Sequence, residues 1–371
     1  MPVKLARIAA LSATLLLAPL AAHAAWPLYR GTAQQLGTAP GTLPPKLKVA
    51  WKFKTGTQPA TSAVINNGRV YVASANGNLF ALDQKSGRKL WSFKTKGKIE
   101  AAPCVAGSAV VIGADDGFLY AVNASNGLPL WKYRTDDKIL GAANTTPAPT
   151  GGGQWIVVGS YDNKVHCVNL GTGKAVWTYE TENYVNGTPG IANGRVVFGG
   201  CDGSLYSVRL NDGKLIKSIQ IGDYIAGSAA VDGDHAYVGH YGNEVVSADL
   251  DAGKVDWTFR DRQFPYFSSP AVTADRIVLG GRDKQVHCIN RSTGKKIWQY
   301  RTRGKVDSSP VICDGKVVVG SEDGRLYMLG LADGKELWTY EIGAAVMSSP
   351  AVSDGFVVIG ANDGTVYAFG G

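Results

Sequence analysis

The sequence is poor in several residue types that mark common protein classes. Of its 371 residues, 18% are charged, five are histidine, five are cysteine and three are methionine, and no Cys-x-x-Cys-His haem motif occurs. Beyond residue 24, no apolar run approaches the roughly 20 residues that a membrane-spanning helix needs. Hydrophobic residues nevertheless make up 45%, and glycines number 47. These values exclude a disordered chain and indicate a globular protein with many tight turns.

The first 24 residues have the pattern of a secretory signal peptide. Lys4 and Arg7 precede an apolar run over residues 8–22, and Ala22-His23-Ala24 offers the small residues that a signal peptidase accepts. We therefore expect cleavage near Ala24 and a periplasmic or secreted protein, for which nucleic acid is a poor partner. Because no cysteine stands at the cleavage point, we expect no lipid anchor.

Tryptophans recur along the chain at a nearly constant interval. Seven of them start a Trp-x-aromatic triplet, at intervals of 40, 40, 46, 80, 41 and 40 residues: Trp51, Trp91, Trp131, Trp177, Trp257, Trp298 and Trp338. Lys217 occupies the tryptophan position halfway through the 80-residue gap. Eight repeats result, each with the length of one propeller blade.

Each repeat holds four short apolar segments separated by turns. In one repeat they are residues 308–312, 316–320, 325–329 and 336–340. Four antiparallel strands per repeat predict an all-β, eight-bladed propeller. The last repeat has only three strands, so we expect Val49–Phe53 to complete it and close the ring. The predicted organisation is a signal peptide (1–24), an N-terminal arm (25–48) and a single propeller (49–371).

Prolines and loop lengths indicate which face of the propeller carries the longer loops. Six prolines are interpreted as opening the innermost strand, where a missing N–H is tolerated: Pro103, Pro147, Pro189, Pro270, Pro310 and Pro350. From the tryptophan to this proline, most repeats have 12 residues, but there are 16 from Trp131 to Pro147 and 13 from Trp257 to Pro270. We therefore expect longer loops on the face where consecutive blades are joined.

The turn before each tryptophan resembles a known family motif. Residues 81–91, Ala-Leu-Asp-Gln-Lys-Ser-Gly-Arg-Lys-Leu-Trp, recur in related form at residues 121–131, 167–177 and 288–298. This is similar to the tryptophan-docking motif of the pyrroloquinoline-quinone (PQQ) propeller family, and Trp26-Pro27-Leu28-Tyr29-Arg30-Gly31 resembles the start of its domains. The resemblance implies that each tryptophan stacks between adjacent blades over a small residue and a glycine. The family contains PQQ-dependent dehydrogenases and non-catalytic members of the BamB type, which assist outer-membrane-protein assembly, and the single propeller is closer in layout to the latter.

The residues do not favour the enzymatic branch. The resemblance implies adjacent disulfide-bonded cysteines, a calcium ion and an aspartate base around the quinone of a dehydrogenase, yet no two cysteines here are adjacent. We expect a non-catalytic scaffold for a protein partner, without cofactor or metal. A PQQ-dependent oxidoreductase with calcium in an atypical site is the alternative. A third hypothesis is carbohydrate or small-ligand binding in the central funnel, near Glu100, Lys305 and Asp307.

Two sets of polar residues resemble metal ligands. Six aspartates share one turn position, and we interpret them as hydrogen-bonding turn residues because identical turns around a ring hold their oxygens apart: Asp116, Asp162, Asp202, Asp283, Asp323 and Asp363. His166-Cys167 and His287-Cys288 lie three blades apart, too far to share zinc, and are interpreted as strand-packing residues. The five cysteines fall in different blades, so we expect buried thiols, with a cross-blade pair such as Cys288–Cys313 as the alternative.

The strongest candidate for partner binding is a group of aromatic residues in the loops of neighbouring blades. Aromatic rings and arginine are frequent anchors of protein interfaces. The candidates are Tyr161, Tyr184, Tyr224, His240, Tyr241, Phe264, Tyr266, Phe267 and Arg282. The alternative is that these rings pack against their own loops.

Positive charge is concentrated near the N-terminal end of the propeller. Residues 46–98 contain eleven basic residues and one acid, Asp83, within a chain of net charge +8. Seven lysines form a predicted basic rim: Lys46, Lys48, Lys52, Lys54, Lys94, Lys96 and Lys98. This rim could attract an anionic membrane surface or an acidic protein, or it protects outer strands against edge pairing. We expect a monomer.

Overall fold

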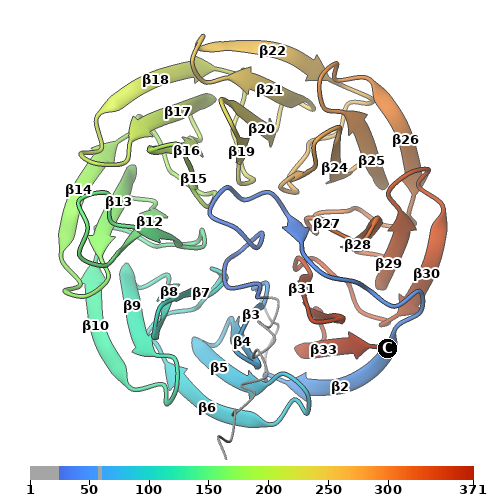
Figure 1. Ribbon diagram of the computed structural model, residues 1–371, viewed down its shortest axis with the longest axis horizontal. Coiled ribbons are helices and arrows are strands. Elements are labelled where there is room, and N and C mark those ends of the chain that lie inside the picture. The colour runs from blue at the N-terminus through green and yellow to red at the C-terminus, as the bar shows by residue number, and fades with distance from the viewer. Residues whose placement is uncertain (1–24, 57–60) are drawn as a thin grey trace, which may run out of the picture.

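The computed structural model describes residues 25–56 and 61–371, which form eight small sheets in a ring around a central axis (Figure 1). No helix occurs within these residues, and so none is available to cross a bilayer. The predicted eight-bladed propeller is confirmed. The predicted signal peptide lies outside the described residues.

The blades, numbered here in chain order, contain four strands from the axis outward. Blade 1 is β3 (Val64–Asn66), β4 (Arg69–Ser74), β5 (Asn78–Asp83) and β6 (Lys89–Lys94). Blade 2 is β7 (Cys104–Ala106), β8 (Ala109–Gly113), β9 (Phe118–Asn123) and β10 (Pro129–Arg134). Blade 3 is β11 (Asn144–Pro147), β12 (Gln154–Gly159), β13 (Lys164–Asn169) and β14 (Ala175–Glu180). Blade 4 is β15 (Gly190–Ala192), β16 (Arg195–Gly199), β17 (Ser204–Arg209) and β18 (Leu215–Gln220).

The second half of the ring repeats this pattern. Blade 5 is β19 (Ala230–Asp232), β20 (His235–Gly239), β21 (Val245–Asp249) and β22 (Lys254–Phe259). Blade 6 is β23 (Ala271–Val272), β24 (Arg276–Gly281), β25 (Gln285–Asn290) and β26 (Lys296–Arg301). Blade 7 is β27 (Val311–Cys313), β28 (Lys316–Gly320), β29 (Arg325–Gly330) and β30 (Glu336–Glu341). Blade 8 is β31 (Ala351–Ser353), β32 (Phe356–Gly360), β33 (Thr365–Gly370) and β2 (Lys48–Lys54).

The ring closes as the sequence predicted. Strand β2 pairs antiparallel with β33, so that Trp51 lies opposite Ala368 and Lys54 opposite Thr365. The first and last described segments of the propeller therefore share one sheet. Opening the ring requires this sheet to break.

Six of the seven tryptophans make the same contact between blades. Their indole N–H groups donate to a backbone carbonyl in the turn between strands three and four of the next blade, at 2.7 to 3.1 Å: Trp51, Trp91, Trp131, Trp177, Trp257 and Trp298. Each ring covers a left-handed glycine of that turn. A Cβ at Gly213 would lie 2.6 Å from the Trp177 ring, so only glycine fits.

The two remaining joints differ for local reasons. Blade 8 has no turn between strands three and four, and Trp338 packs instead against Phe369, with 5.7 Å between ring centroids. Between blades 4 and 5, the side chain of Lys217 lies over Gly253 in place of an indole ring. The repeat therefore preserves the joint geometry even where the tryptophan is missing.

The N-terminal arm crosses the centre of the ring (Figure 1). It hydrogen-bonds the inner strands of six blades, through Trp26 to Ile65, Pro27 to Val105, Ala33 to Ile191, Gln34 to Val231, Leu36 to Val272 and Gly37 to Ile312. Strand β1 (Thr38–Ala39) then runs parallel to β27. Buried Arg30 donates to the carbonyls of Pro270 and Ser309, at 3.1 Å each. The sequence predicted a separate arm but not its position in the central channel.

One loop prediction is wrong. Strand β11 begins at Asn144, and Pro147 is its last residue, paired with Gln154. The additional residues of this repeat therefore lie in β11 and in the turn to β12, on the face opposite the blade-joining loops. Pro147 was predicted to open this strand, but Ala143 occupies the position before the strand that proline holds in most blades.

Candidate binding face and central funnel

Two kinds of loop form one surface, named here the loop face. In seven blades, the turn between strands two and three donates a backbone N–H to a carbonyl of the loop entering the same blade, at 2.9 to 3.3 Å. Tyr161 bonds Lys138 in this way, Cys201 bonds Tyr184, and Tyr241 bonds Tyr224. These bonds fix the two loop types to each other, so the loop face is a rigid surface.

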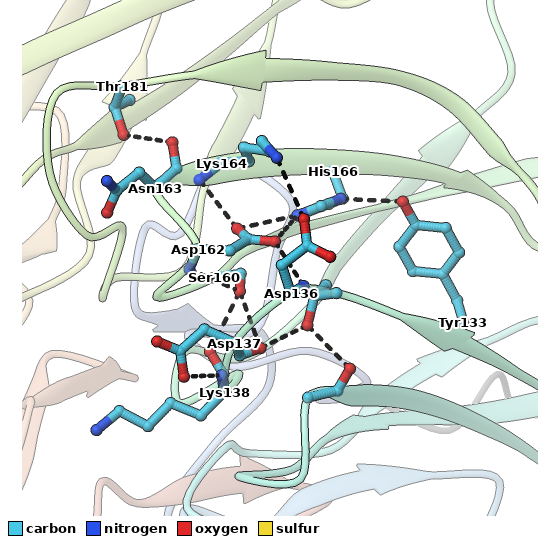
Figure 2. Close-up of polar contacts among 12 residues, drawn as sticks. Tyr133, Asp136, Asp137, Lys138, Ser160, Asp162, Asn163, Lys164, His166 and Thr181 are labelled. Atoms are coloured by element: carbon cyan, nitrogen blue, oxygen red, sulfur yellow. Dashed lines mark hydrogen bonds and ion pairs between the residues drawn. The ribbon is translucent and has the colours of Figure 1, made fainter.

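The repeated aspartates hold the turns of this face. Figure 2 shows Asp162 accepting hydrogen bonds from His166 Nε2 at 3.0 Å and from the backbone N–H groups of Lys164 and Asp136 at 3.1 Å each. In four other blades a tyrosine hydroxyl replaces the histidine, at 2.6 to 2.8 Å from the aspartate. Burial by itself would raise the pKa of Asp162, but the bonds from His166 and the backbone outweigh it and lower the pKa. The interpretation of these aspartates as turn residues is confirmed.

Two groups of carboxylates and histidines have potential ligand atoms within 4.8 Å of one another. One is His235, Asp249 and Asp256, and the other is Asp261, Asp283 and His287. In both, protein groups already contact the carboxylates: His235 contacts Asp256 at 3.1 Å, His287 contacts Asp283 at 2.9 Å, and Lys296 contacts Asp261 at 3.1 Å. Neither group contains a cysteine of the two His-Cys pairs. Both pairs lie within strands, one in β13 and the other in β25.

All five cysteines are free thiols, and four of them are buried. Burial raises the pKa of Cys104, Cys167 and Cys288 to about 12. The alternative of a Cys288–Cys313 disulfide is therefore not realised in this structure. Because the thiolate is the reactive form, these buried thiols are poor nucleophiles.

Aromatic rings follow the loop face across blades 3 to 6, and we name this set the aromatic arc: Tyr161, Tyr184, Tyr224, Tyr241, Phe264 and Phe267. Tyr161 and Tyr184 are stacked, with ring centroids 4.7 Å apart and planes at 15°. The ammonium group of Lys138 lies 4.5 Å from the Tyr161 ring centroid. Lys138 was not among the predicted residues. It directly precedes the apolar residue that recurs at this loop position along the repeats of the chain.

The other end of the aromatic arc is supported by an arginine. Tyr241 lies 6.1 Å from Tyr224 and 4.4 Å from Phe267 between ring centroids. The guanidinium of Arg282 covers the Phe267 ring at 3.7 Å, and it binds Asp307 with two nitrogens at 3.0 and 2.7 Å. Such a bidentate pair fixes the orientation of both side chains. Four rings remain well exposed, namely Tyr184 at 44%, Tyr224 at 53%, Tyr241 at 44% and Phe264 at 46%.

Two predicted contact residues do not reach the surface. Tyr266 and His240 are each 1% exposed. Tyr266 packs against Phe259 and His287 and lies beneath Gly239, where a Cβ would come within 2.6 Å of it. His240 accepts a hydrogen bond from the N–H of Gly242 and supports the turn from below. Their assignment to a partner-contacting surface was wrong, and both are supports of the aromatic arc.

A ring of hydroxyl groups surrounds the axis below the loop face. The N–H groups of Thr188, Ser228, Ser269, Ser309 and Ser349 each donate to a serine hydroxyl at the same position of the next blade, at 2.8 to 3.0 Å. The last of these acceptors is Ser62 of blade 1. Blades 2 and 3 carry Ala102 and Ala142 instead. We name this set the serine ring.

The serine ring lines the lower part of a funnel that opens on the loop face. The funnel has a volume of about 510 Å³, and Tyr29 of the arm lies at its floor, with its hydroxyl 3.1 Å from that of Ser309. Glu100, Asn186 and Asp307 line its wall. Of the three predicted funnel residues, Glu100 and Asp307 line it, whereas Lys305 is exposed outside the lining.

The funnel residues do not fit PQQ with calcium. PQQ carries three carboxylates, whereas the funnel residues within the described chain include two carboxylates and no lysine, arginine or histidine. A calcium ion needs six to eight converging oxygens. One of the two carboxylates, Asp307, already binds Arg282 through both oxygens.

The seven lysines of the basic rim are all exposed. They lie on β2 and β6, the outermost strands of adjacent blades 8 and 1, and on the segments that flank these strands. Lys52 lies over the Tyr367 ring at 5.1 Å, and Lys94 donates to the carbonyl of Asn76. The basic rim is thus separate from the aromatic arc, which covers blades 3 to 6.

Comparisons with known proteins agree with this architecture. A designed protein, Ika8, matches with a TM-score of 0.76 and 18% identity over 85% of this chain and 97% of that one. A quinohemoprotein alcohol dehydrogenase from Pseudomonas putida HK5 matches with a TM-score of 0.78 and 12% identity, over 94% of this chain and 80% of that one. Comparison with curated protein sequences gives no match.

The family comparison is more specific. BamB from Moraxella catarrhalis matches with a TM-score of 0.73 and 20% identity, over 88% of this chain and 98% of that one. The sequence also matches the family described as outer membrane protein assembly factor BamB over residues 44–150, 140–259, 214–299 and 266–370. These segments together span the whole propeller. The chain therefore belongs to the BamB family of PQQ-like β-propellers.

Proposed function

We propose that this protein is a non-catalytic scaffold of the cell envelope, which binds a protein partner through the aromatic arc during outer-membrane-protein or envelope assembly. One observation carries the proposal: four well-exposed aromatic rings lie on one half of a face that backbone hydrogen bonds hold rigid. Rigid aromatic anchors lose little conformational entropy on binding and are frequent hot spots. Membership of the BamB family supports the assignment to assembly.

A photocrosslinking experiment tests this function. A photoreactive amino acid is placed at Tyr184 or Tyr224, and the matched control position is Leu128, which is 62% exposed in a turn on the opposite face. We expect crosslinks to a component of outer-membrane-protein assembly from the two arc positions and none from Leu128. Equal crosslinking from all three positions would contradict a binding role for the aromatic arc.

Genetic complementation tests the assignment to assembly. Loss of the protein should lower the amount of folded outer-membrane protein, measured by its heat-dependent mobility on gels. The wild-type chain should restore that amount, and a variant with Tyr184, Tyr224 and Tyr241 all changed to serine should not. Full restoration by this variant would show that the aromatic arc is dispensable.

The basic rim is a second contact surface in this proposal. Seven exposed lysines on adjacent blades create a local positive potential that attracts anionic lipid head groups. Salt screens such attraction within about 10 Å at 0.1 M. Sedimentation with anionic vesicles should therefore fall as salt rises, whereas loss of the aromatic arc should leave it unchanged.

The likeness in fold to a quinohemoprotein alcohol dehydrogenase makes a PQQ-dependent oxidoreductase the second candidate. The test is direct, because PQQ and Ca²⁺ can be mixed with the purified protein. A bound chromophore together with substrate-dependent dye reduction would replace the scaffold proposal. We expect neither, because the part of the funnel lining contributed by residues 25–56 and 61–371 offers no positive side chain to three carboxylates.

A further inference from the structure

The central funnel is a second candidate site, which shares only Phe267 with the aromatic arc among the described residues. Its volume of about 510 Å³ lies within the roughly 300–1,000 Å³ typical of small-molecule sites. The arm closes it at Tyr29, because this segment hydrogen-bonds inner-strand residues, such as Ile312, that lie beyond the serine ring as seen from the loop face. A funnel of this size with a closed floor excludes a folded domain and a polypeptide threaded through the channel.

The base of the funnel presents hydroxyl groups whose hydrogens are available to donate to a ligand. In the serine ring, Ser62, Ser228 and Ser349 each accept an N–H bond from a neighbouring blade, which leaves the hydroxyl hydrogen free to donate. These side chains are at least nine-tenths buried and line the funnel. The Tyr29 hydroxyl adds a further group at the floor. A ligand reaching this depth must therefore offer hydrogen-bond acceptors.

The wall of the funnel adds acceptors and apolar surface. Glu100 and Asn186 line it, and neither side chain has a hydrogen-bond partner among residues 25–56 and 61–371. Phe267, Leu140 and Met347 supply the apolar part of the lining. With Glu100 uncompensated and no positive side chain in the described lining, an anionic ligand would be repelled. The lining therefore favours a ligand without negative charge that offers acceptors, donors and an apolar face.

We infer that the funnel binds a short neutral oligosaccharide. Sugar hydroxyls both donate and accept, as this lining requires, and the C–H face of a pyranose ring packs against the apolar side chains of Leu140 and Met347. In this assignment Asn186 and Glu100 bind paired hydroxyls near the mouth, and the serine ring donates to the sugar oxygens below. The inference concerns a second ligand and does not depend on the proposed protein partner.

Calorimetric titration of the mature chain tests the inference. The probes are maltotriose, cellotriose and triacetylchitotriose, with trigalacturonate as an anionic probe of similar size. We expect at least one neutral probe to bind and trigalacturonate not to bind. Asn186→Ala should weaken the affinity about tenfold, as expected for a lost pair of hydrogen bonds. Ala226→Trp, which fills the funnel from its wall, should abolish binding.

The control variant is Tyr184→Ser, which alters the aromatic arc and leaves the funnel intact. It should bind the neutral probe with wild-type affinity while it weakens partner crosslinking. The inference is overturned if no neutral probe binds, if trigalacturonate binds equally well, or if Ala226→Trp binds like the wild type. Binding of a neutral peptide in the funnel, with no binding of any saccharide probe, would also overturn it. Circular dichroism and unfolding curves establish that each variant is folded.

Discussion

The two halves of the loop face share one backbone and differ in their side chains. At the outermost position of the turn between strands two and three, blades 3, 5 and 6 carry Tyr161, Tyr241 and Arg282, whereas blades 7 and 8 carry Glu322 and Asn362. The backbone hydrogen bond to the preceding loop is present at all five of these positions. The scaffold therefore does not determine where aromatic residues gather.

This comparison locates the recognition surface. Variable side chains on an invariant loop geometry indicate binding more directly than a variation in loop length. In the joining loops, blades 4 and 5 are entered through Tyr184 and Tyr224, whereas blades 2 and 7 are entered through Lys98 and Lys305. One half of the face is thus built for apolar contact, and the other half remains polar.

The largest expected effect comes from removing the rings of one half. The variant Tyr184→Ser, Tyr224→Ser, Tyr241→Ser should weaken partner binding about 100-fold, from about 1 kcal/mol per exposed hot-spot ring. Its control on the polar half is Lys305→Ser, Glu322→Ser, which should change the affinity less than about threefold. Crosslinking yield against concentration gives both affinities. Equal losses from the two variants would remove the distinction between the halves.

At the axis, a different division of the ring affects stability. The serine ring is continuous from blade 4 through blade 8 to blade 1 and is interrupted in blades 2 and 3. Ser309→Ala should destabilise the fold by about 1–3 kcal/mol, because it leaves the buried N–H of Ser269 without an acceptor. Ala102→Ser, on the interrupted side, removes no such bond and should cost much less. Urea unfolding of both variants measures the difference.

The arginine that supports the aromatic arc should have a smaller effect, and lysine should not replace it. Arg282→Lys keeps the charge but loses both the planar stack on Phe267 and the bidentate bond to Asp307. We expect a loss of about fivefold to tenfold in partner affinity for Arg282→Lys and for Arg282→Gln alike. Glu322→Gln at the corresponding position of blade 7 is the control. Wild-type affinity in Arg282→Lys would show that charge alone suffices.

The fold followed from periodicity, whereas side-chain orientation within the site did not. Eight repeats and the incomplete last repeat determined the blades and the closing strand. Tyr266, by contrast, was assigned to the surface because of its residue type. Its register shows otherwise, since it occupies the position of Ile139, Val185 and Val306, which are buried beneath strand-two glycines. Comparison of this position across the repeats would have predicted that Tyr266 is buried.

The arm and the serine ring were beyond the reach of the repeat pattern. The arm belongs to no repeat, and its path is set by backbone hydrogen bonds together with buried side chains such as Trp26, Leu43 and Arg30, none of which recurs along the chain. The serines are visible in the sequence, but their bonds between blades depend on the radius at which eight inner strands meet. Local sequence patterns do not predict that radius.

The smallest expected effect is a pH dependence confined to the aromatic half. His240 lies under the turn of Tyr241, where blades 7 and 8 have Ser321 and Ala361, so the polar half has no titratable group at this position. Burial lowers the pKa of His240, against the opposing influence of Glu244 and Asp223, and the folded state therefore favours the neutral ring.

The sign of this dependence follows from where the proton binds first. Unfolded histidine titrates near pH 6.5, so below about that pH the unfolded state takes up a proton that folded His240 resists, and stability falls as pH decreases. Hydrogen exchange in the turn of Tyr241 should accelerate between about pH 6.5 and 5, while exchange in the turn of Glu322 should keep only its intrinsic pH dependence. The variant His240→Asn retains an acceptor for the N–H of Gly242 and should lose the additional acceleration. An unchanged pH response in that variant would assign the effect to another group and leave the two halves of the face alike in their response to acid.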